Sequence, residues 1–381
     1  MDLLSSLSIP ASNTVEKHNY TIELSIIVPT FKEIDNIGEL VKRVCNCLHG
    51  IAWEIVFVDD DSPDGTADRV REMARTHSQV RCLHRIGRRG LSSACIEGML
   101  SSAAPYVTVM DADLQHDETL LPKMLEILRK GDVDIVIGSR YIPGGSTGQW
   151  EKSRAWISRF ATQLSRIVLK ADLADPMSGF FMMRHDAMIR CVRGNLSGIG
   201  FKVLLDLFAS SPQPLRFQEL PYQFRERYAG ESKLDTMVAW EYLLLLLDKL
   251  IGHIVPVRFI AFSLIGGLGV IVHLLVLTVV YRQLDRSFIV GQTTATLVAM
   301  TSNFFLNNFL TYRDRRLRGW GLLRGWISFT LACSIGAIAN VGIAAYLFKM
   351  NTFWITSAAA GVLIGAVWNY AVTAFYTWQK S

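Results

Sequence analysis

The sequence predicts an α/β domain with a mostly parallel sheet, followed by an all-helical membrane domain. Over the first 232 residues, short apolar runs alternate with helical patterns, whereas four long uncharged stretches fill the C-terminal third. Charge divides in the same way: residues 253–381 hold ten basic and two acidic residues, a net +8, and residues 1–252 carry −3. The whole-chain net charge of +5 and mean hydropathy of +0.26 therefore describe neither part, although they exclude a disordered chain.

We expect residues 1–23 to be an N-terminal extension and residues 24–232 to be the α/β domain. The extension has no basic residue before Lys17 and no sustained apolar core, so we expect no secretory signal in it. Buried strands are predicted at 24–29, 54–59, 80–84, 106–110 and 134–137, with helices between them at 33–48, 66–76, 91–101 and 119–129. Such a β-α-β series favours a parallel sheet that binds ligands at the carboxyl ends of its strands.

Three polar clusters follow predicted strands and would share that edge of the sheet. They are Pro29–Glu33, Asp59–Gly65 and Asp111–Gln115. In the second cluster we expect Asp61 to contact a nucleotide and Asp64 or Thr66 to cap the following helix. Each cluster alone could be an ordinary turn, but three on one edge favour a binding site.

The third cluster predicts a metal site. Asp111 and Asp113 supply two carboxylates and Gln115 an amide oxygen, with no His or Cys among the expected ligands. Such hard oxygen ligands suit Mg²⁺ or Mn²⁺, which bridge substrate phosphates. The sequence has neither a Walker A motif nor a soluble Gly-rich dinucleotide fingerprint, so a nucleotide would be held by the carboxylates and the metal. The six cysteines show no Cys-x-x-Cys spacing, which predicts reduced thiols and no zinc site.

The membrane domain is predicted over residues 259–381. Its helices are expected at about 259–281, 288–311, 326–348 and 353–378, each longer than the roughly 20 residues that span a bilayer. Five arginines between the second and third helices predict that this segment is cytoplasmic, together with both termini and the α/β domain. We expect residues 233–258 to form an interfacial amphipathic helix and linker; a helix of the soluble core is the alternative.

A repeat within the membrane domain predicts two tandem helical hairpins. The pattern Asn-aromatic-x4-Phe-x-Thr-aromatic occurs at 303–312 and again at 369–378, and Ile265–Leu268 and Ile335–Ile338 are candidate matches in the preceding helices. The asparagines at membrane depth favour interhelical hydrogen bonds, with a lipid-headgroup or transport path as the alternative.

Six motifs in order resemble those of family-2 glycosyltransferases of the GT-A fold, specifically dolichol- or polyprenyl-phosphate mannose synthases. The motifs are Val28–Glu33, Val58–Thr66, Asp111–His116, Gly138–Tyr141, Asp175–Phe180 and Arg225–Lys233. The four-helix tail is similar to the membrane domain that accompanies several members. Two positions differ from the family pattern: Phe31 stands where Tyr is frequent, and Asp117-Glu118 replaces a commoner Pro, which we interpret as a surface change.

The resemblance implies roles for particular residues. The nucleoside would contact Pro29, Phe31, Glu33 and Asp61; the metal on the donor diphosphate would bind Asp111, Asp113 and Gln115; and the acceptor phosphate would bind Arg140, Arg154 and Ser158. We expect Asp113, Arg140 and Arg154 to carry the catalysis, and Lys202, Arg225, Arg227 and Lys233 to neutralise the nucleotide. A predicted helix over 150–170 places Arg154 and Ser158 on one face, which suits a phosphate; a basic helix resting on anionic lipid is the alternative.

The resulting functional hypothesis is inverting transfer of mannose from GDP-mannose to a dolichyl or polyprenyl phosphate. A phosphate monoester is largely dianionic at neutral pH and needs no general base. Alternatives are the same reaction with UDP-glucose or another sugar nucleotide, a processive polysaccharide synthase with Asp175 as base, and a lipid-linked-sugar transporter. The synthase is disfavoured because the chain lacks a Gln-x-x-Arg-Trp motif. The expected partners are the sugar nucleotide, the lipid phosphate and the membrane, with no nucleic acid.

Overall fold

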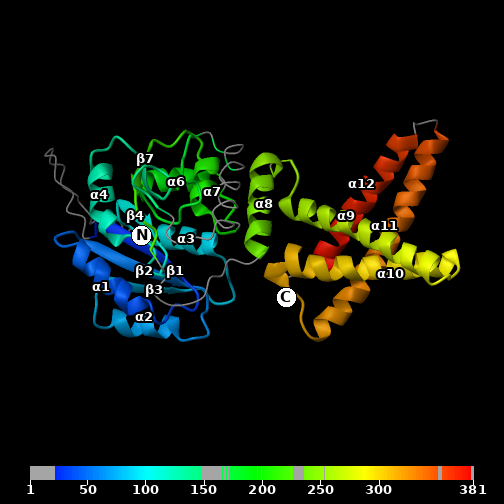
Figure 1. Ribbon diagram of the computed structural model, residues 1–381, viewed down its shortest axis with the longest axis horizontal. Coiled ribbons are helices and arrows are strands. Elements are labelled where there is room, and N and C mark those ends of the chain that lie inside the picture. Colours follow the sequence, from blue (N-terminus) through cyan, green and yellow to red (C-terminus); the bar gives the residue numbers. More distant parts are fainter. Residues whose placement is uncertain are drawn as a thin grey trace, which may run out of the picture.

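The protein consists of an α/β domain and a helical domain, as the computed structural model shows (Figure 1). The structure describes residues 22–146, 165, 169, 171–194, 196–198, 200–225, 236–252, 254–350 and 354–378. Helix α8 (Thr236–Ile251) stands between the two domains in Figure 1.

A mostly parallel sheet forms the centre of the α/β domain, as predicted, and it has seven strands where five were expected. The strands are β1 (Leu24–Thr30), β2 (Trp53–Asp59), β3 (Val80–His84), β4 (Tyr106–Val109), β5 (Ile135–Ser139), β6 (Phe181–Arg184) and β7 (Phe217–Pro221). Their order is β3-β2-β1-β4-β6-β5-β7, and only β6 runs antiparallel to its neighbours β4 and β5. The first five strands lie within two residues of their predicted positions, whereas β6 and β7 were not predicted.

Helices cover both faces of the sheet. Those described are α1 (Ile37–Cys47), α2 (Thr66–Ala74), α3 (Leu91–Leu100), the short 3₁₀ helix η1 (Glu118–Leu120), α4 (Leu121–Arg129), α6 (His185–Arg193) and α7 (Val203–Ser210). The helix predicted from residue 33 begins only at Ile37, because residues 33–36 form a turn closed by the Asn36 amide on the Glu33 carbonyl, 3.0 Å apart.

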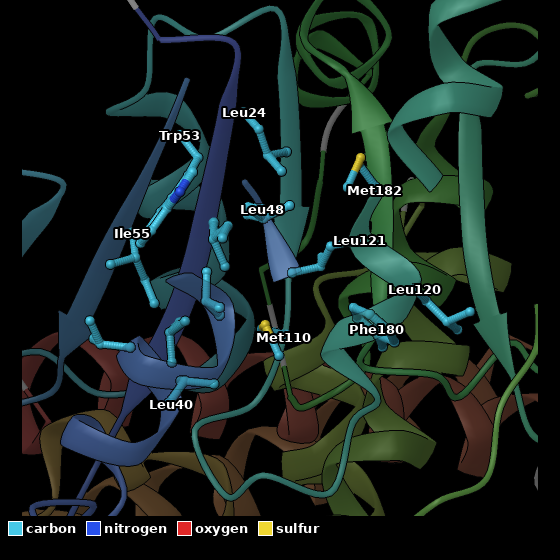
Figure 2. Packing of buried hydrophobic residues seen from close by; sticks show 14 of the residues in the cluster. Leu24, Leu40, Leu48, Trp53, Ile55, Met110, Leu120, Leu121, Phe180 and Met182 are labelled. Carbon is cyan, nitrogen blue, oxygen red and sulfur yellow. The ribbon is translucent and has the colours of Figure 1, made fainter. Parts of the chain in front are cut away.

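Alternate residues of β1 face two separate hydrophobic cores. Ile26 packs with α1, α2 and α4, and Ile27 packs with α3, α6 and α7, as the period-two alternation of a strand requires. Figure 2 shows part of the first core, where Leu40, Met110 and Phe180 lie around the sheet. Gly98 of α3 lets that helix approach the sheet, since a Cβ there would come within 2.8 Å of Val58.

Helix α8 packs against the α/β domain. Leu245 and Leu246 belong to the second core, and the Lys249 ammonium lies 2.6 Å from Asp206 of α7. Leu250 and Ile251 are exposed at its end. The helix therefore belongs to the soluble core on one side, the alternative that the sequence left open, and it also presents apolar residues that suit a membrane surface.

All four stretches predicted to span the membrane are helical. They correspond to α9 (Val257–Thr278), α10 (Phe288–Leu306), α11 (Trp320–Lys349) and α12 (Trp354–Val372), with π-helical segments η2 (Val279–Gln283), η3 (Asn307–Thr311) and η5 (Thr373–Thr377). A 3₁₀ turn, η4 (Arg313–Arg315), lies between the second and third stretches. Within the described residues, Val257–Gln283 and Trp320–Ile338 are long and apolar enough to cross a membrane, with mean hydropathies of 2.5 and 1.4. Helix α11 begins at Trp320, earlier than predicted, so Arg324 lies in the helix and not in the loop.

The predicted repeat corresponds to two similar hairpins. Segments η3 and η5 end the second helix of each hairpin, and the repeat-equivalent rings of Tyr312 and Trp378 stack at 4.1 Å with an interplanar angle of 5°. Gly269 of α9 faces Asn303, and Gly336 of α11 faces Asn369 in the same way. The equivalent glycines are therefore Gly269 and Gly336, a slightly different match from the one that the sequence suggested.

Candidate active site

The first two polar clusters meet at the carboxyl ends of β1 and β2, as predicted. The Thr30 hydroxyl donates to Asp59 Oδ2 at 3.0 Å, and the Ser62 hydroxyl donates to the same oxygen at 2.6 Å. The Glu33 amide donates to Thr66 Oγ1 at 3.1 Å. Asp59 is fully buried. Asp59 therefore holds the turn in shape, and a ligand would contact the neighbouring residues of the cluster.

The other acids of the second cluster have separate roles. Asp61 is half-exposed, and its left-handed backbone (φ 59°) turns the side chain toward His84, whose Nε2 lies 2.9 Å away. Asp64 Oδ1 accepts from the Thr66 backbone amide at 3.1 Å, so Asp64 satisfies the first amide of α2 from the position before Gly65, which is the N-cap residue. Burial raises the pKa of Asp64, but the hydrogen bonds from Thr66 and Ile34 outweigh this and lower the pKa overall.

A buried ion pair that sequence reasoning missed supports the same edge. Asp60 accepts from Arg85, which is only 2% exposed, and from the Gly90 amide at 2.7 Å. Burial raises the pKa of Asp60 despite these bonds. Nothing in the sequence links Asp60 to Arg85 beyond their places after β2 and β3, which are adjacent strands.

The expected nucleoside residues lie at this edge in different settings. Pro29 is buried within β1, opposite Val58 of β2. Phe31 is partly exposed, and the Arg89 guanidinium lies 4.6 Å from its ring centre. Glu33 Oε2 accepts from the side-chain amide of Asn36, whose Nδ2 lies 2.7 Å away. Arg89 was not predicted, and it places a cation over the ring expected to face a nucleoside.

The predicted metal ligands follow β4 in a tight turn. Asp111 is 38% exposed at its side chain and Asp113 is buried, with the Gln115 amide donating to Asp113 Oδ1 at 3.2 Å. Leu114, which lies between Asp113 and Gln115, has a left-handed backbone (φ 63°). Gln115 Nε2 donates to the Arg225 carbonyl at 2.9 Å, which ties the turn to the segment after β7. Within the described residues, no group of three or more His, Cys, Asp or Glu forms a metal-binding cluster.

His116 lies behind this turn. Its side chain is 2% exposed, and its ring stacks on Phe180 at 5.1 Å with an interplanar angle of 11°. Burial lowers the pKa of His116 to about 4, so the imidazole is neutral at pH 7. The sequence marked His116 only as part of a motif.

Arg140, expected to bind the acceptor phosphate, forms a buried pair with Asp175. Its backbone amide and Nε donate to Asp175 Oδ2 at 3.0 and 2.8 Å, and Nη2 donates to Oδ1 at 2.9 Å. Arg140 is 8% exposed and Asp175 is fully buried. Burial lowers the pKa of Arg140, but the bonds to Asp175 outweigh this and raise it. The Phe224 ring joins this pair to the metal turn, because it lies 5.5 Å from the Arg140 guanidinium and 6.0 Å from the His116 ring.

The structure gives the remaining described cations definite neighbours. Lys202 Nζ lies 3.5 Å from the Met177 carbonyl, beside the Asp175–Phe180 motif. Arg225 donates to Glu118 at 2.7 Å and to Asp117 at 2.8 Å. Glu118 is 8% exposed, so the Asp117-Glu118 change is not confined to the surface as expected; it anchors Arg225 beside the metal turn. Arg154, Ser158, Arg227 and Lys233, with most of the helix predicted over 150–170, lie outside the described residues.

Comparisons with known proteins agree with this arrangement. Residues 25–191 match the model of glycosyl transferase family 2, and residues 261–378 match that of the GtrA/DPMS transmembrane domain. A dolichol-phosphate mannosyltransferase of Pyrococcus furiosus is 33% identical over 362 residues, which cover 94% of this chain and 99% of that protein. This chain belongs to the dolichol-phosphate mannosyltransferase family.

Two fungal relatives match a smaller part of this chain than the Pyrococcus furiosus protein does. The dolichol-phosphate mannosyltransferases of Saccharomyces cerevisiae and Mycosarcoma maydis are 37% and 36% identical, each over 58% of this chain and over 85% and 77% of their own lengths. A solved glucosyl-3-phosphoglycerate synthase of Mycobacterium tuberculosis superposes with a TM-score of 0.43 at 17% identity, over 60% of this chain and 80% of that one. The family assignment therefore rests on the sequence relatives, and it makes this chain a glycosyltransferase with a membrane domain.

Proposed function

We propose that this glycosyltransferase moves mannose from GDP-mannose to a dolichyl or polyprenyl phosphate, with inversion at the anomeric carbon and release of GDP. The observation that carries the proposal is the placement of Asp111 and Asp113 at the carboxyl edge of the sheet, joined through Phe224 to the buried Arg140. The relatives' shared name supports mannose as the sugar and dolichyl phosphate as the acceptor.

The turn after β4 fits a divalent metal that arrives with the nucleotide. Mg²⁺ and Mn²⁺ are commonly held by one or two carboxylates while water and substrate phosphates complete the coordination shell. Asp111, Asp113 and Gln115 offer such a donor set in a turn fixed by Leu114 and Arg225. When bound, Mg²⁺ or Mn²⁺ would neutralise charge on the departing diphosphate.

The chain's own residues would bring two anions together and leave the acceptor to attack unaided. A phosphate monoester needs no deprotonation at neutral pH. Asp175 accepts bonds from Arg140 on both oxygens and is fully buried, which argues against its use as a general base. We assign the acceptor phosphate to Arg140, Arg154 and Ser158, and the nucleotide to Phe31, Glu33, Asp61, Lys202, Arg225 and Lys233, with Pro29 shaping the edge.

The membrane domain places this chemistry at a lipid surface. A polyprenyl phosphate keeps its chain in the bilayer and its phosphate at the headgroups, so the enzyme must act at that level. The exposed apolar end of α8 and the helices that follow would hold the α/β domain there, on the cytoplasmic side. The proposed span count is four.

A direct assay tests the proposal. Full-length protein in detergent is incubated with labelled GDP-mannose, a polyprenyl phosphate and Mn²⁺, and UDP-glucose replaces the donor in a parallel reaction. We expect a β-linked mannosyl lipid from GDP-mannose only, and at least a 100-fold loss of rate in Asp113→Asn. Asp68→Asn, an exposed acid on α2, is the matched control and should retain the wild-type rate. An α-linked product, or no lipid product from either donor, would contradict the proposal.

A further inference from the structure

The imidazole of His116 is hydrogen-bonded to the backbone of Asp111. The Asp111 amide donates to His116 Nδ1 at 3.1 Å. An amide nitrogen can only donate, so Nδ1 must be the unprotonated nitrogen of the ring. The neutral imidazole therefore carries its proton on Nε2.

The protonated nitrogen faces the side chain of the same residue. His116 Nε2 lies 3.7 Å from Asp111 Oδ2, which is too long for a hydrogen bond but close enough for the N–H dipole to act on the carboxylate. One imidazole thus contacts both the backbone and the carboxylate of Asp111. The ring is 2% exposed, so water does not screen this interaction strongly.

The ring itself is held on several sides. It stacks on Phe180 at 5.1 Å, and the Tyr222 and Phe224 rings approach edge-on at 5.9 and 6.0 Å. Gly179 lies against the remaining side: a Cβ there would come 3.3 Å from Asp111 Oδ2 and 3.5 Å from His116 Cε1. Little room is left for the His116 ring to move.

We propose that His116 is a positioning residue that sets the position of Asp111 for binding the nucleotide-bound metal. The inference rests on the proposed function, because it assumes that Asp111 is a metal ligand. Residues that orient a ligand by hydrogen bonding typically contribute 10- to 100-fold in metal affinity. His116 does not itself touch the metal or the substrate in this assignment.

Two substitutions separate positioning from packing. His116→Asn places an amide oxygen where Nδ1 stands and can still accept from the Asp111 amide, although it loses the ring. His116→Phe keeps a ring that can stack on Phe180 but removes the acceptor. If positioning matters, the Asn variant should resemble the wild type; if packing matters, the Phe variant should.

The measurement is Mn²⁺ binding to the full-length protein in the presence of GDP, followed by the electron paramagnetic resonance signal of free Mn²⁺. We expect His116→Phe to weaken Mn²⁺ binding 10- to 100-fold and His116→Asn to weaken it less than about threefold. Wild-type affinity in His116→Phe, or equal losses in both variants, would overturn the proposal. Should neither variant fold, ¹⁵N-histidine NMR of the wild type decides: a proton on Nε2 supports the proposal, and one on Nδ1 overturns it.

Asp111→Asn distinguishes this inference from the proposed function. If Asp111→Asn abolishes Mn²⁺ binding with GDP while His116→Phe leaves it intact, only the role of His116 fails. If Asp111→Asn binds Mn²⁺ as the wild type does, the metal site itself is wrong and both proposals are overturned. If Asp111→Asn and His116→Phe both lose Mn²⁺ binding with GDP while His116→Asn keeps it, the metal site and the role of His116 are both supported.

Discussion

Arg140 and Asp175 are both buried, so each charge depends on the other for compensation. Two hydrogen bonds to Asp175 fix the guanidinium beside Phe224 and the adjacent Tyr141 ring, and a third holds the Arg140 backbone amide. A sequence shows the arginine of a Gly-Ser-Arg-Tyr motif but not the acid that orients it 35 residues later. Removing one member of such a pair leaves an uncompensated charge in the interior, which costs more than the pair contributes.

We therefore predict that Asp175→Asn destabilises the α/β domain by about 3–5 kcal/mol. For a domain of this size that corresponds to a fall in Tm of roughly 10 °C. The fall in Tm is measured by thermal unfolding of the full-length protein in detergent, monitored by tryptophan fluorescence. The double variant Arg140→Gln with Asp175→Asn removes both charges and should recover part of the loss. An unchanged Tm in Asp175→Asn would show that the pair is not a stability determinant.

The Gly–Asn contacts of the two hairpins are a property of the helical elements. A Cβ on Gly269 would come within 2.5 Å of Asn303 Oδ1, and one on Gly336 would meet Asn369 in the same way. Among the residues that the structure describes, the buried Oδ1 atoms of both asparagines have no hydrogen-bond partner. Glycine at positions 269 and 336 therefore leaves the space that the asparagine side chains occupy, as small residues do where membrane helices pack closely.

We predict that Gly269→Ala weakens the α9–α10 hairpin by about 1–3 kcal/mol, because the methyl group displaces Asn303. Gly267→Ala is the matched control: it lies on the same helix, has nothing within 4 Å of its Cβ position, and should be neutral or slightly stabilising. The measurement is the midpoint of thermal aggregation in detergent. Adding Asn303→Ala to Gly269→Ala should restore the midpoint; if it does not, the contact is not the cause.

At the element scale, the sequence predicted what periodicity and length reveal. Five strands and the helices between them were placed within a few residues because their apolar runs are bounded by turn residues. Strand β6 was not predicted because it has only four residues and ends in Arg184. Strand β7 was not predicted because its five residues include Glu219 and Pro221. For the site, the strand-end clusters were predictable from topology. The partners of Arg140, Arg225 and Asp60 were not, since tertiary packing alone brings them together.

On the scale of the whole molecule, the ends of the membrane helices that lie on the side of α8 are also the basic ends. Figure 1 shows α9 beginning, and α10 and α12 ending, on the side of α8. Arg315 Nη1 donates to the Trp378 carbonyl at 3.4 Å, so the segment after α10 lies beside the end of α12. Basic segments remain in the cytoplasm during insertion. The same side should therefore hold the α/β domain.

We predict that residue 318 and the α/β domain are accessible from one side of the membrane and residue 284 from the other. Cys45 is the exposed native cysteine of the α/β domain. The single substitutions Arg318→Cys and Leu284→Cys each add one cysteine, at opposite ends of the membrane helices. In intact cells, a membrane-impermeant maleimide should label Leu284→Cys alone, because positive charge holds the opposite end in the cytoplasm. Permeabilisation should expose Cys45 and Arg318→Cys together, which also serves as the control for expression. Labelling of Cys45 in intact cells would show that the orientation is the opposite of the one predicted. Labelling of residue 284 only after permeabilisation would place it on the same side as residue 318 and so rule out a single crossing between residues 284 and 318.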